Sequence, residues 1–207
     1  MDLKQIRTES IQAAKRLGVD VLATLPLLDE GLEMRNAEET TSRILVMNVV
    51  AATAYGFDKG KAIAWLNQEA LTDSLSEQEK RFVLEGVGQP ARFKVQVEGA
   101  WALAWAMGIT SELNFAKDCD NNFVTMLPNL KQSEPGGDFR KRANTRSLEQ
   151  VAKACDLAYC LHWAIRQSEL TGKPTLRNVK PYVIVERRRA LDWLLSKEAW
   201  DEVSLNT

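Results

Sequence analysis

The chain has 207 residues, of which 45% are hydrophobic and 27% are charged. A chain of this length can bury roughly 70% of its unfolded surface, so it needs neither a metal nor a disulfide to fold. The charge is nearly balanced, with 27 basic and 28 acidic residues and a formal net charge of −1. Nucleic-acid-binding proteins normally have a basic excess or a basic face, so we expect no nucleic-acid partner.

The local groups of basic residues do not change this expectation. Arg140, Lys141, Arg142 and Arg146 fall in a polar stretch that we interpret as a solvated loop. The run 187–189 is made of three arginines that belong to a predicted helix, where consecutive side chains point in different directions.

The sequence also argues against secretion and membrane insertion. The first residues lead into a polar amphipathic stretch without the apolar core of roughly 7–15 residues that signal peptides have. No segment approaches the ~18 uncharged apolar residues of a membrane span. The three cysteines are an odd number without framework spacing, which is typical of reduced thiols. We therefore expect a cytoplasmic protein that does not bind a membrane.

Helix signals dominate the first third of the chain. Residues 2–17 are predicted to form a helix that ends at Gly18. The next helix is predicted over residues 36–55, because Asn36 with Glu39 resembles a capping box. The residues between these helices read as extended chain.

Two shorter helices are predicted next. Asp58 can cap a third helix that runs to about residue 70. Ser76 with Glu79 forms a clearer capping box, which starts a short fourth helix that stops near Gly86.

The middle of the chain contains the most apolar predicted helix and the weakest signals. Pro90 suits the first turn of a fifth helix, which runs to Met107 and is closed by Gly108. Residues 110–146 are poorly periodic, with at most a short helix near 121–127 and a turn at Pro135–Asp138. A stretch of this kind inside a domain is either a functional lid or a mobile segment.

The last two long helices are predicted over residues 147–170 and 178–196. Ser147 with Gln150 caps the first of them, and Asn178 caps the second. We find no internal repeat and no linker. The sequence therefore predicts a single all-α domain over residues 1–207, a compact irregular bundle of about seven to eight helices. The fifth helix and the last two long helices should form its centre.

Several polar residues lie on apolar helix faces. In the helix over 147–170, the 3–4 spacing of apolar residues places His162, the only histidine of the chain, on the buried face. A neighbouring stripe carries Asp156 one turn before Tyr159. Comparable positions in other helices complete a set of six candidate residues: Arg43, Glu98, Asp156, Tyr159, His162 and Glu186.

This set has two interpretations, which the sequence leaves open. An unpaired buried charge is costly, so these groups should find one another if they are buried. They then form an internal network that orients the helices. Alternatively, they line a pocket, where two or more carboxylates and a histidine can do acid–base work if burial shifts their pKa values. Arg43 would hold an anionic group of a small molecule in such a pocket.

Other chemistries are disfavoured. The sequence has no Gly-x-Ser-x-Gly elbow, no phosphate-binding loop and no dinucleotide fingerprint. A single histidine cannot supply a di-iron bundle site. Zinc binding is disfavoured because Cys155 and Cys160 point about 140° apart on one helix. We expect no metal and no cofactor.

Several segments resemble one known family: residues 17–20, 37–43, 98–108, 156–164 and 185–193. In this order they cover essentially the whole chain, and together they resemble the bacterial domain-of-unknown-function family 4272. Cys160 and Asn206 depart from the pattern, which has an arginine and an aspartate there. The resemblance implies a cytosolic helical protein of bacteria and implies no agreed activity.

For function, the sequence favours a non-catalytic binding or interaction protein with a protein partner. The absence of catalytic motifs, the single histidine and the near-neutral charge motivate this expectation. The alternative is a small-molecule enzyme or sensor that uses the internal Glu/Asp/His cluster. The sequence does not decide between an enzyme and a binding protein, and it leaves the oligomeric state open.

Overall fold

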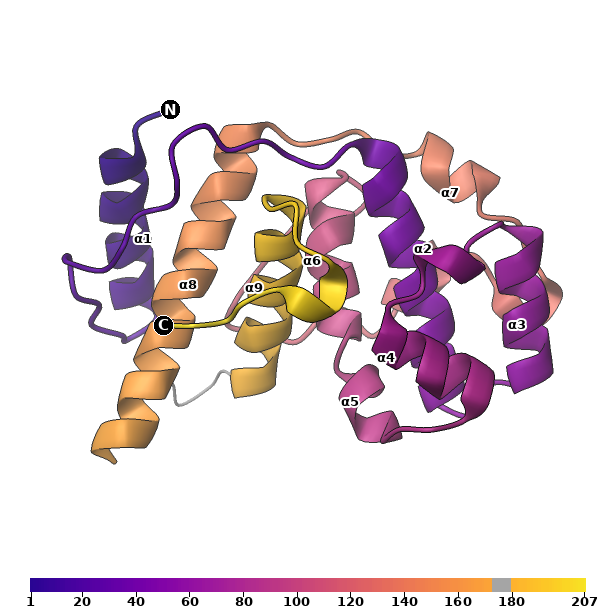
Figure 1. The fold of residues 1–207 in the computed structure, drawn as a ribbon. Helices are drawn as coiled ribbons and strands as arrows, with labels where there is room; N and C mark the ends of the chain where they lie inside the picture. The colour runs from indigo at the N-terminus through magenta and orange to yellow at the C-terminus, as the bar shows by residue number, and fades with distance from the viewer. Residues whose placement is uncertain (173–179) are drawn as a thin grey trace.

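The computed structural model describes residues 1–172 and 180–207, and these residues form helices joined by loops, without strands (Figure 1). The expected all-α class is confirmed. None of the described helices is both long enough and apolar enough to cross a membrane. The expected helix cap at Asn178 lies outside the described residues.

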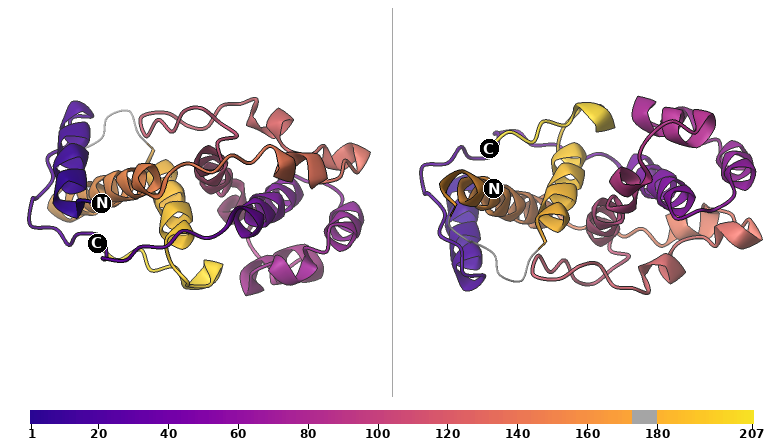
Figure 2. Two further views of the ribbon diagram at one scale, coloured as in Figure 1. Left: turned by 90° about the horizontal axis from the view of Figure 1, so that it is seen from above. Right: turned by 90° about the horizontal axis from the view of Figure 1, so that it is seen from below.

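Five helices pack in a row, and each contacts the next. Figures 1 and 2 show this row from three directions. In spatial order the helices are α1 (Leu3–Arg16), α8 (Leu148–Thr171), α9 (Pro181–Leu194), α6 (Val97–Ala106) and α2 (Ala37–Ala54). The three helices expected at the centre are therefore neighbours, with α9 between α8 and α6.

Most of the shorter elements gather around α2 at the far end of the row, whereas η5 (Trp200–Glu202) lies beside α9 and α6 (Figures 1 and 2). The α-helical ones are α3 (Lys59–Gln68), α4 (Glu77–Lys80), α5 (Pro90–Lys94) and α7 (Gly137–Lys141). A π-helical turn, η2 (Arg81–Glu85), extends α4. The 3₁₀ turns are η1 (Thr72–Ser74), η3 (Phe123–Met126), η4 (Leu130–Gln132) and η5.

Local sequence signals set most helix ends. The Ser147 hydroxyl accepts the Gln150 N–H, and the Gln150 side chain accepts the Ser147 N–H, so the capping box of α8 is complete. The box at the start of α2 is only half formed. Asn36 Oδ1 accepts the Glu39 N–H at 2.8 Å, but the Glu39 carboxylate pairs with Arg35. The nearby guanidinium offers this carboxylate a stronger, charge-assisted partner than a backbone amide.

The predicted fifth helix is divided in two. Between α5 and α6, Gln96 N–H donates to Phe93 O and Glu98 N–H donates to Val95 O, which is the i→i−3 pattern of a 3₁₀ turn. The expectation of one continuous helix from Pro90 to Met107 was therefore wrong. The apolar pattern continues through this joint, so periodicity alone did not reveal it.

The interpretation of the basic cluster as a solvated loop holds only for the exposure of Lys141 and Arg142. Arg140 and Lys141 lie in α7, and Arg140 pairs with Glu69 at 2.7 Å. Arg146 Nε donates to Trp105 O at 2.8 Å, at the carboxyl end of α6. The last carbonyls of a helix lack intrahelical donors, so an arginine from a neighbouring segment stabilises this end.

A glycine permits the close packing of α6. A Cβ built at Gly99 would lie 3.0 Å from Met47 Cε of α2 and 3.1 Å from Glu186 O of α9. Real Cβ contacts are rarely this short, so the missing side chain lets α6 fit between its two neighbours. This contact brings Glu98 close to α9.

Candidate functional site

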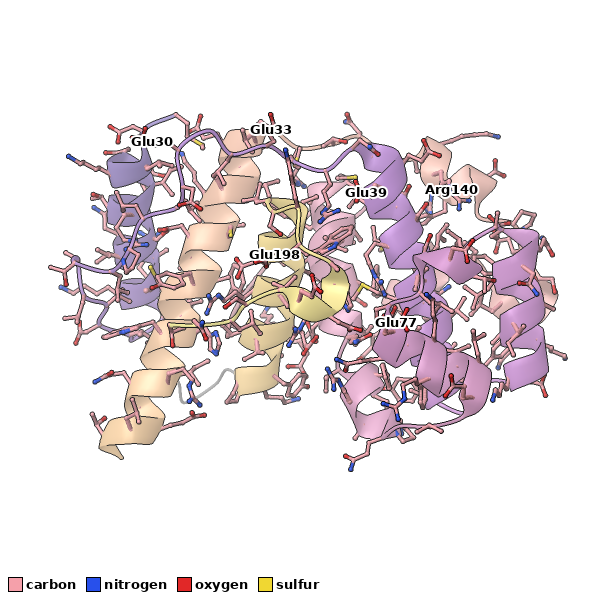
Figure 3. All side chains as sticks on the ribbon, in the orientation of Figure 1. Glu30, Glu33, Glu39, Glu77, Arg140 and Glu198 are labelled. Atoms are coloured by element: carbon pink, nitrogen blue, oxygen red, sulfur yellow. The ribbon has the colours of Figure 1, made fainter. Side chains whose placement is uncertain are left out.

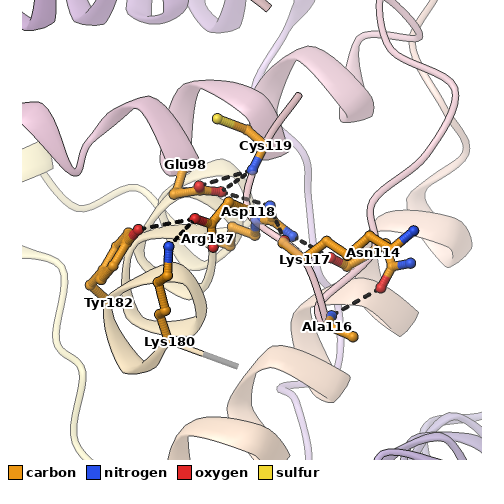
Figure 4. A network of polar contacts seen from close by, with 9 residues as sticks. All are labelled: Glu98, Asn114, Ala116, Lys117, Asp118, Cys119, Lys180, Tyr182 and Arg187. Carbon is orange, nitrogen blue, oxygen red and sulfur yellow. Dashed lines mark hydrogen bonds and ion pairs between the residues drawn. The ribbon is translucent and has the colours of Figure 1, made fainter. Parts of the chain in front are cut away.

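The Glu98–Arg187 pair joins α6, α9 and the loop after α6 (Figure 4). Arg187 donates to Glu98 Oε2 through Nε at 3.0 Å and Nη2 at 2.6 Å, and both side chains are at most 2% exposed. Glu98 Oε1 also accepts the Cys119 N–H at 2.9 Å. Arg187 further donates to the carbonyls of Asn114 and Lys117. The pair therefore anchors part of the segment 110–146, which had the weakest sequence signals.

A second buried ion pair joins α1, near the start of the chain, to α8. Arg7 of α1 donates to Asp156 of α8 through two bonds, from Nε to Oδ2 at 3.1 Å and from Nη2 to Oδ1 at 2.7 Å. Arg7 also donates to the carbonyls of Leu25 and Pro26. This guanidinium fixes α1 against α8 and holds the loop that follows α1.

Tyr159 and His162 meet a third arginine, Arg188. The Tyr159 ring has the guanidinium carbon of Arg7 at 5.6 Å and that of Arg188 at 4.9 Å from its centroid. Arg188 Nη1 lies 2.6 Å from His162 Nδ1. Burial, and then the positive charge of Arg188, lower the pKa of His162 to about 4. His162 is thus neutral near pH 7, and its Nδ1 accepts the hydrogen bond from Arg188.

The contribution of His162 to the stability of the fold should be lost as the pH is lowered from about 6.5 to about 4. The folded pKa of His162 lies below its ordinary 6.5, so the unfolded chain takes up the proton first. Above about pH 6.5 this contribution to stability is fully present. His162→Gln keeps an acceptor for Arg188 but cannot titrate. Urea unfolding at about pH 7 and about pH 4.5 should show a larger loss in the wild type than in this variant.

Comparing the wild type with His162→Gln isolates the effect of the histidine on the pH dependence of stability. Burial raises the pKa values of Glu186 and Asp192, which favours the folded state as the pH falls. Because both carboxyls are present in the wild type and in the variant, they cancel in the difference. An equal loss of stability in both proteins would show that His162 does not titrate in this window.

Arg43 and Glu186 lie in two different parts of the structure. Arg43 of α2 pairs with Glu79, which is fully buried and whose other oxygen accepts the Ser76 N–H of the α4 capping box. The Arg43 guanidinium lies 4.6 Å from the centroid of the Trp200 ring. Glu186 Oε2 is buried without a hydrogen-bond partner among the described residues. Its nearest cation is Arg189, whose Nε lies 3.8 Å away.

The structure divides the six candidate residues. Asp156, Tyr159 and His162 are linked through Arg7 and Arg188, whereas the other three lie elsewhere. The expectation that buried members of the set find one another was wrong, because Glu98, Asp156 and Arg43 each pair with a residue outside it. Sequence reasoning missed these partners: Arg7, Glu79, Arg187 and Arg188. The run of arginines in α9 was the available signal, since its members do point in different directions, to α6 and to α8.

A wide concavity lies beside Arg43. It has a volume of about 1030 Å³ and lies between the start of α2, the start of α4 and the segment around η5. We call it the C-terminal cleft. Its lining comprises Arg35, Asn36, Glu38, Glu39, Ser42, Arg43, residues 74–78, Trp193 and residues 197–202.

Two residues of this cleft carry buried polar atoms. Arg43 Nε and Gln78 Oε1 are both buried and make no hydrogen bond to the described residues. The Arg43 side chain is only 5% exposed. Trp193 and Trp200 also line the cleft, with ring centroids 5.8 Å apart in an edge-to-face arrangement.

The rim of the C-terminal cleft is acidic. Glu39, Glu77 and Glu198 lie around the yellow turn η5 in Figure 3. Asp201 Oδ2 accepts the Gln78 N–H at 3.0 Å, so this carboxylate connects η5 to the start of α4. The other acidic side chains of the lining are Glu38 and Glu202.

A smaller concavity of about 450 Å³ contains part of the candidate set. Arg7, Asp156, Tyr159 and Arg188 line it. The Arg188 guanidinium is engaged there, because it donates to Asp192, Leu205 O and Asn206 O as well as to His162. The described residues contain no group of three or more His, Cys, Asp or Glu side chains placed to hold a metal ion.

The cysteines offer no activated nucleophile in the folded state. Burial raises the pKa of Cys119 and of Cys160 to about 12. The pKa of Cys155, whose Sγ lies 3.1 Å from Asp192 Oδ1, is raised as well, first by burial and then by this carboxylate. Thiolate is the reactive form, so these thiols are unreactive near neutral pH.

The described structure is thus an all-α protein in which buried arginine–carboxylate pairs connect distant helices. A family model, Domain of unknown function (DUF4272), matches residues 6–203, and the chain belongs to this family. No curated protein and no solved structure matches the chain.

Proposed function

We propose that this chain is a non-catalytic binding protein that engages a protein partner through the C-terminal cleft. The observation that carries the proposal is the C-terminal cleft itself, a concavity of about 1030 Å³ lined by two tryptophans and six acidic side chains. Protein interfaces are enriched in aromatic residues at their centre and have a polar rim.

The state of Glu98, Asp156 and His162 supports binding over catalysis. A general base needs a free lone pair within reach of a substrate proton. Glu98 and Asp156 instead accept several bonds from Arg187 and Arg7, and both carboxylates are almost fully buried. His162 already accepts a bond from Arg188.

The size of the cleft supports a macromolecular partner. Small-molecule pockets span roughly 300–1,000 Å³ and enclose most of the ligand. The C-terminal cleft, at about 1030 Å³, is at the upper end of this range and is bordered by exposed side chains such as Glu77. Its shape suits a segment of another chain.

Site-specific crosslinking tests this proposal. A photoreactive amino acid would replace Glu77, on the cleft rim, and in a control protein Glu149, which also lies in the first turn of a helix and is exposed. In extracts of the source cells, we expect a discrete adduct from position 77 and none from position 149. The same adducts from both positions, or none from position 77, would contradict the proposal.

The captured partner must then depend on the interior of the cleft. With purified proteins, Gln78→Met should weaken its binding about tenfold, which corresponds to about 1.4 kcal/mol, because the cleft loses the polar side chain of Gln78. Gln132→Met, an exposed glutamine outside the cleft, should leave the affinity unchanged. If both variants bind the partner with the same affinity, the partner contacts the protein outside the cleft.

The smaller concavity supports a second candidate function, a small-molecule sensor or enzyme. Asp156 and Tyr159 line it, and they belong to the candidate set. A thermal shift caused by a metabolite, kept in Gln78→Met and lost in Tyr159→Phe, would favour this function over the binding of a protein partner.

A further inference from the structure

We infer that the concavity beside His162 is a binding site of its own, which takes a small molecule through a carboxylate or phosphate group. We call this concavity the His162 pocket. It has a volume of about 590 Å³, lies along α8 between His162 and Leu170, and is bordered by residues 205–207. It shares no lining residue with the C-terminal cleft. Its volume is within the range of roughly 300–1,000 Å³ that small-molecule pockets span.

The imidazole of His162 offers a hydrogen-bond donor whose position is fixed. Arg188 Nη1 lies 2.6 Å from His162 Nδ1. A guanidinium can only donate, so Nδ1 accepts, and the neutral ring carries its proton on Nε2. His162 is 6% exposed, yet Nε2 itself is not fully buried and makes no hydrogen bond to the described residues. Because His162 lines the pocket, a ligand there can reach this N–H group.

The other polar side chains of the His162 pocket also favour an acceptor. Arg166, Trp163, Gln167 and Asn206 line it, and each of these side chains carries N–H donors. The described lining has no Asp or Glu side chain. Carboxylate and phosphate groups present several acceptor oxygens. The donors of the pocket therefore match such a group better than they match an amine or another donor-rich ligand.

The charges around His162 favour an anion over a neutral acceptor. Burial and the charges of Arg188, Arg166 and Arg189, in this order, lower the pKa of His162 to about 4. These guanidiniums thus produce a positive potential at the imidazole. Arg166 pairs with Glu169, but both side chains are more than half exposed, so the pair is weak and a ligand can compete for the guanidinium. Arginine can bind a carboxylate or phosphate through two parallel hydrogen bonds.

Nuclear magnetic resonance of the 207-residue chain tests this inference, because His162 is its only histidine and gives a single set of imidazole signals. The ¹⁵N signals of the free protein near neutral pH should show a neutral ring with its proton on Nε2. Inorganic phosphate and succinate are the anionic probes, and glycerol and sodium chloride are the controls. We expect at least one anionic probe to shift the imidazole signals to saturation, and neither control to do so.

Matched charge variants locate the binding of the anion. Arg166→Gln removes an exposed positive charge from the pocket and should weaken the binding of the anion by about two- to fivefold. Arg16→Gln removes an exposed positive charge at the end of α1, outside the pocket, and should leave the affinity unchanged. Substitutions at exposed positions rarely disturb a fold, so both variants should stay folded.

The outcomes of these measurements decide the inference independently of the C-terminal cleft. Saturation by phosphate alone assigns the pocket to phosphorylated molecules, and saturation by succinate alone assigns it to carboxylic acids. A proton on Nδ1, equal shifts with sodium chloride, no shift with either anion, or equal effects of the two variants would overturn the inference. Crosslinking at position 77 does not involve this pocket, so either proposal can fail while the other stands.

Discussion

Glu98→Gln should lower the free energy of unfolding by about 3 kcal/mol. Removing one partner of a buried ion pair typically costs 3–5 kcal/mol, because the remaining charge stays buried and uncompensated. Arg187 is 1% exposed and pairs with no other carboxylate of the described residues. Glutamine keeps the shape and one acceptor for the Cys119 N–H, so the loss reports mainly on the charge. Urea unfolding followed by far-UV circular dichroism measures it.

An exposed pair provides the control for this prediction. Asp138 and Lys141 form an ion pair in which both side chains are more than three quarters exposed. Exposed pairs contribute at most about 1 kcal/mol, so Asp138→Asn should have a small effect. If Glu98→Gln is as mild as Asp138→Asn, the buried pair is not a stabilising connection between α6 and α9.

A double-mutant cycle separates the pair from its surroundings. Arg187→Met also removes the donor to the carbonyls of Asn114 and Lys117. Glu98→Leu/Arg187→Met should therefore recover only part of the stability, because these carbonyls and the Cys119 N–H stay unpaired. Hydrogen exchange should show faster opening of the loop 110–120 in Glu98→Gln than in the wild type.

Gly108→Ala should destabilise the protein by about 3 kcal/mol or more. Gly108 has φ +66°, where an L-residue costs about 1–2 kcal/mol. A Cβ at this position would also lie 2.4 Å from the backbone oxygen of Asn144. That segment is held close, since the N–H groups of Asn144 and Arg146 donate to the last carbonyls of α6. The backbone must shift, which breaks these bonds.

Gly18→Ala is the matched control for the clash. Gly18 also follows a helix and has φ +81°, but no atom lies within 4 Å of a Cβ built there. Its substitution should cost only the strain of the left-handed conformation, about 1–2 kcal/mol. Thermal or urea unfolding of both variants gives the difference. Equal destabilisation would mean that the backbone near Asn144 moves away from the added methyl group without a loss of stability.

Local sequence patterns account for most of the helices because their causes are local. The residues of the Ser147–Gln150 box are three positions apart, and the 3–4 spacing around His162 defines the buried face of one helix. The errors arose where a tertiary contact decided the conformation. Gly137 and Asp138 were expected in a turn, but they start α7, whose Arg140 reaches Glu69.

The candidate site was predictable only in part. Burial of Glu98, Asp156 and His162 follows from the helix pattern, and burial implies a partner. The identity of the partner does not follow. Arg187 is 89 positions from Glu98, and Arg7 is 149 positions from Asp156. The packing of the helices therefore determines which arginine pairs with each carboxylate.

Caps and amphipathic spacing act within a few residues, so the sequence alone predicts the helical class, the main helix ends and the burial of some charged residues, such as Glu98 and Asp156. Only the tertiary structure decided the arginine–carboxylate pairs and the C-terminal cleft. The cleft joins the start of α2, the start of α4 and the segment around η5, which are far apart along the chain. Its acidic rim and unpartnered atoms exist because helix packing brings these three segments together.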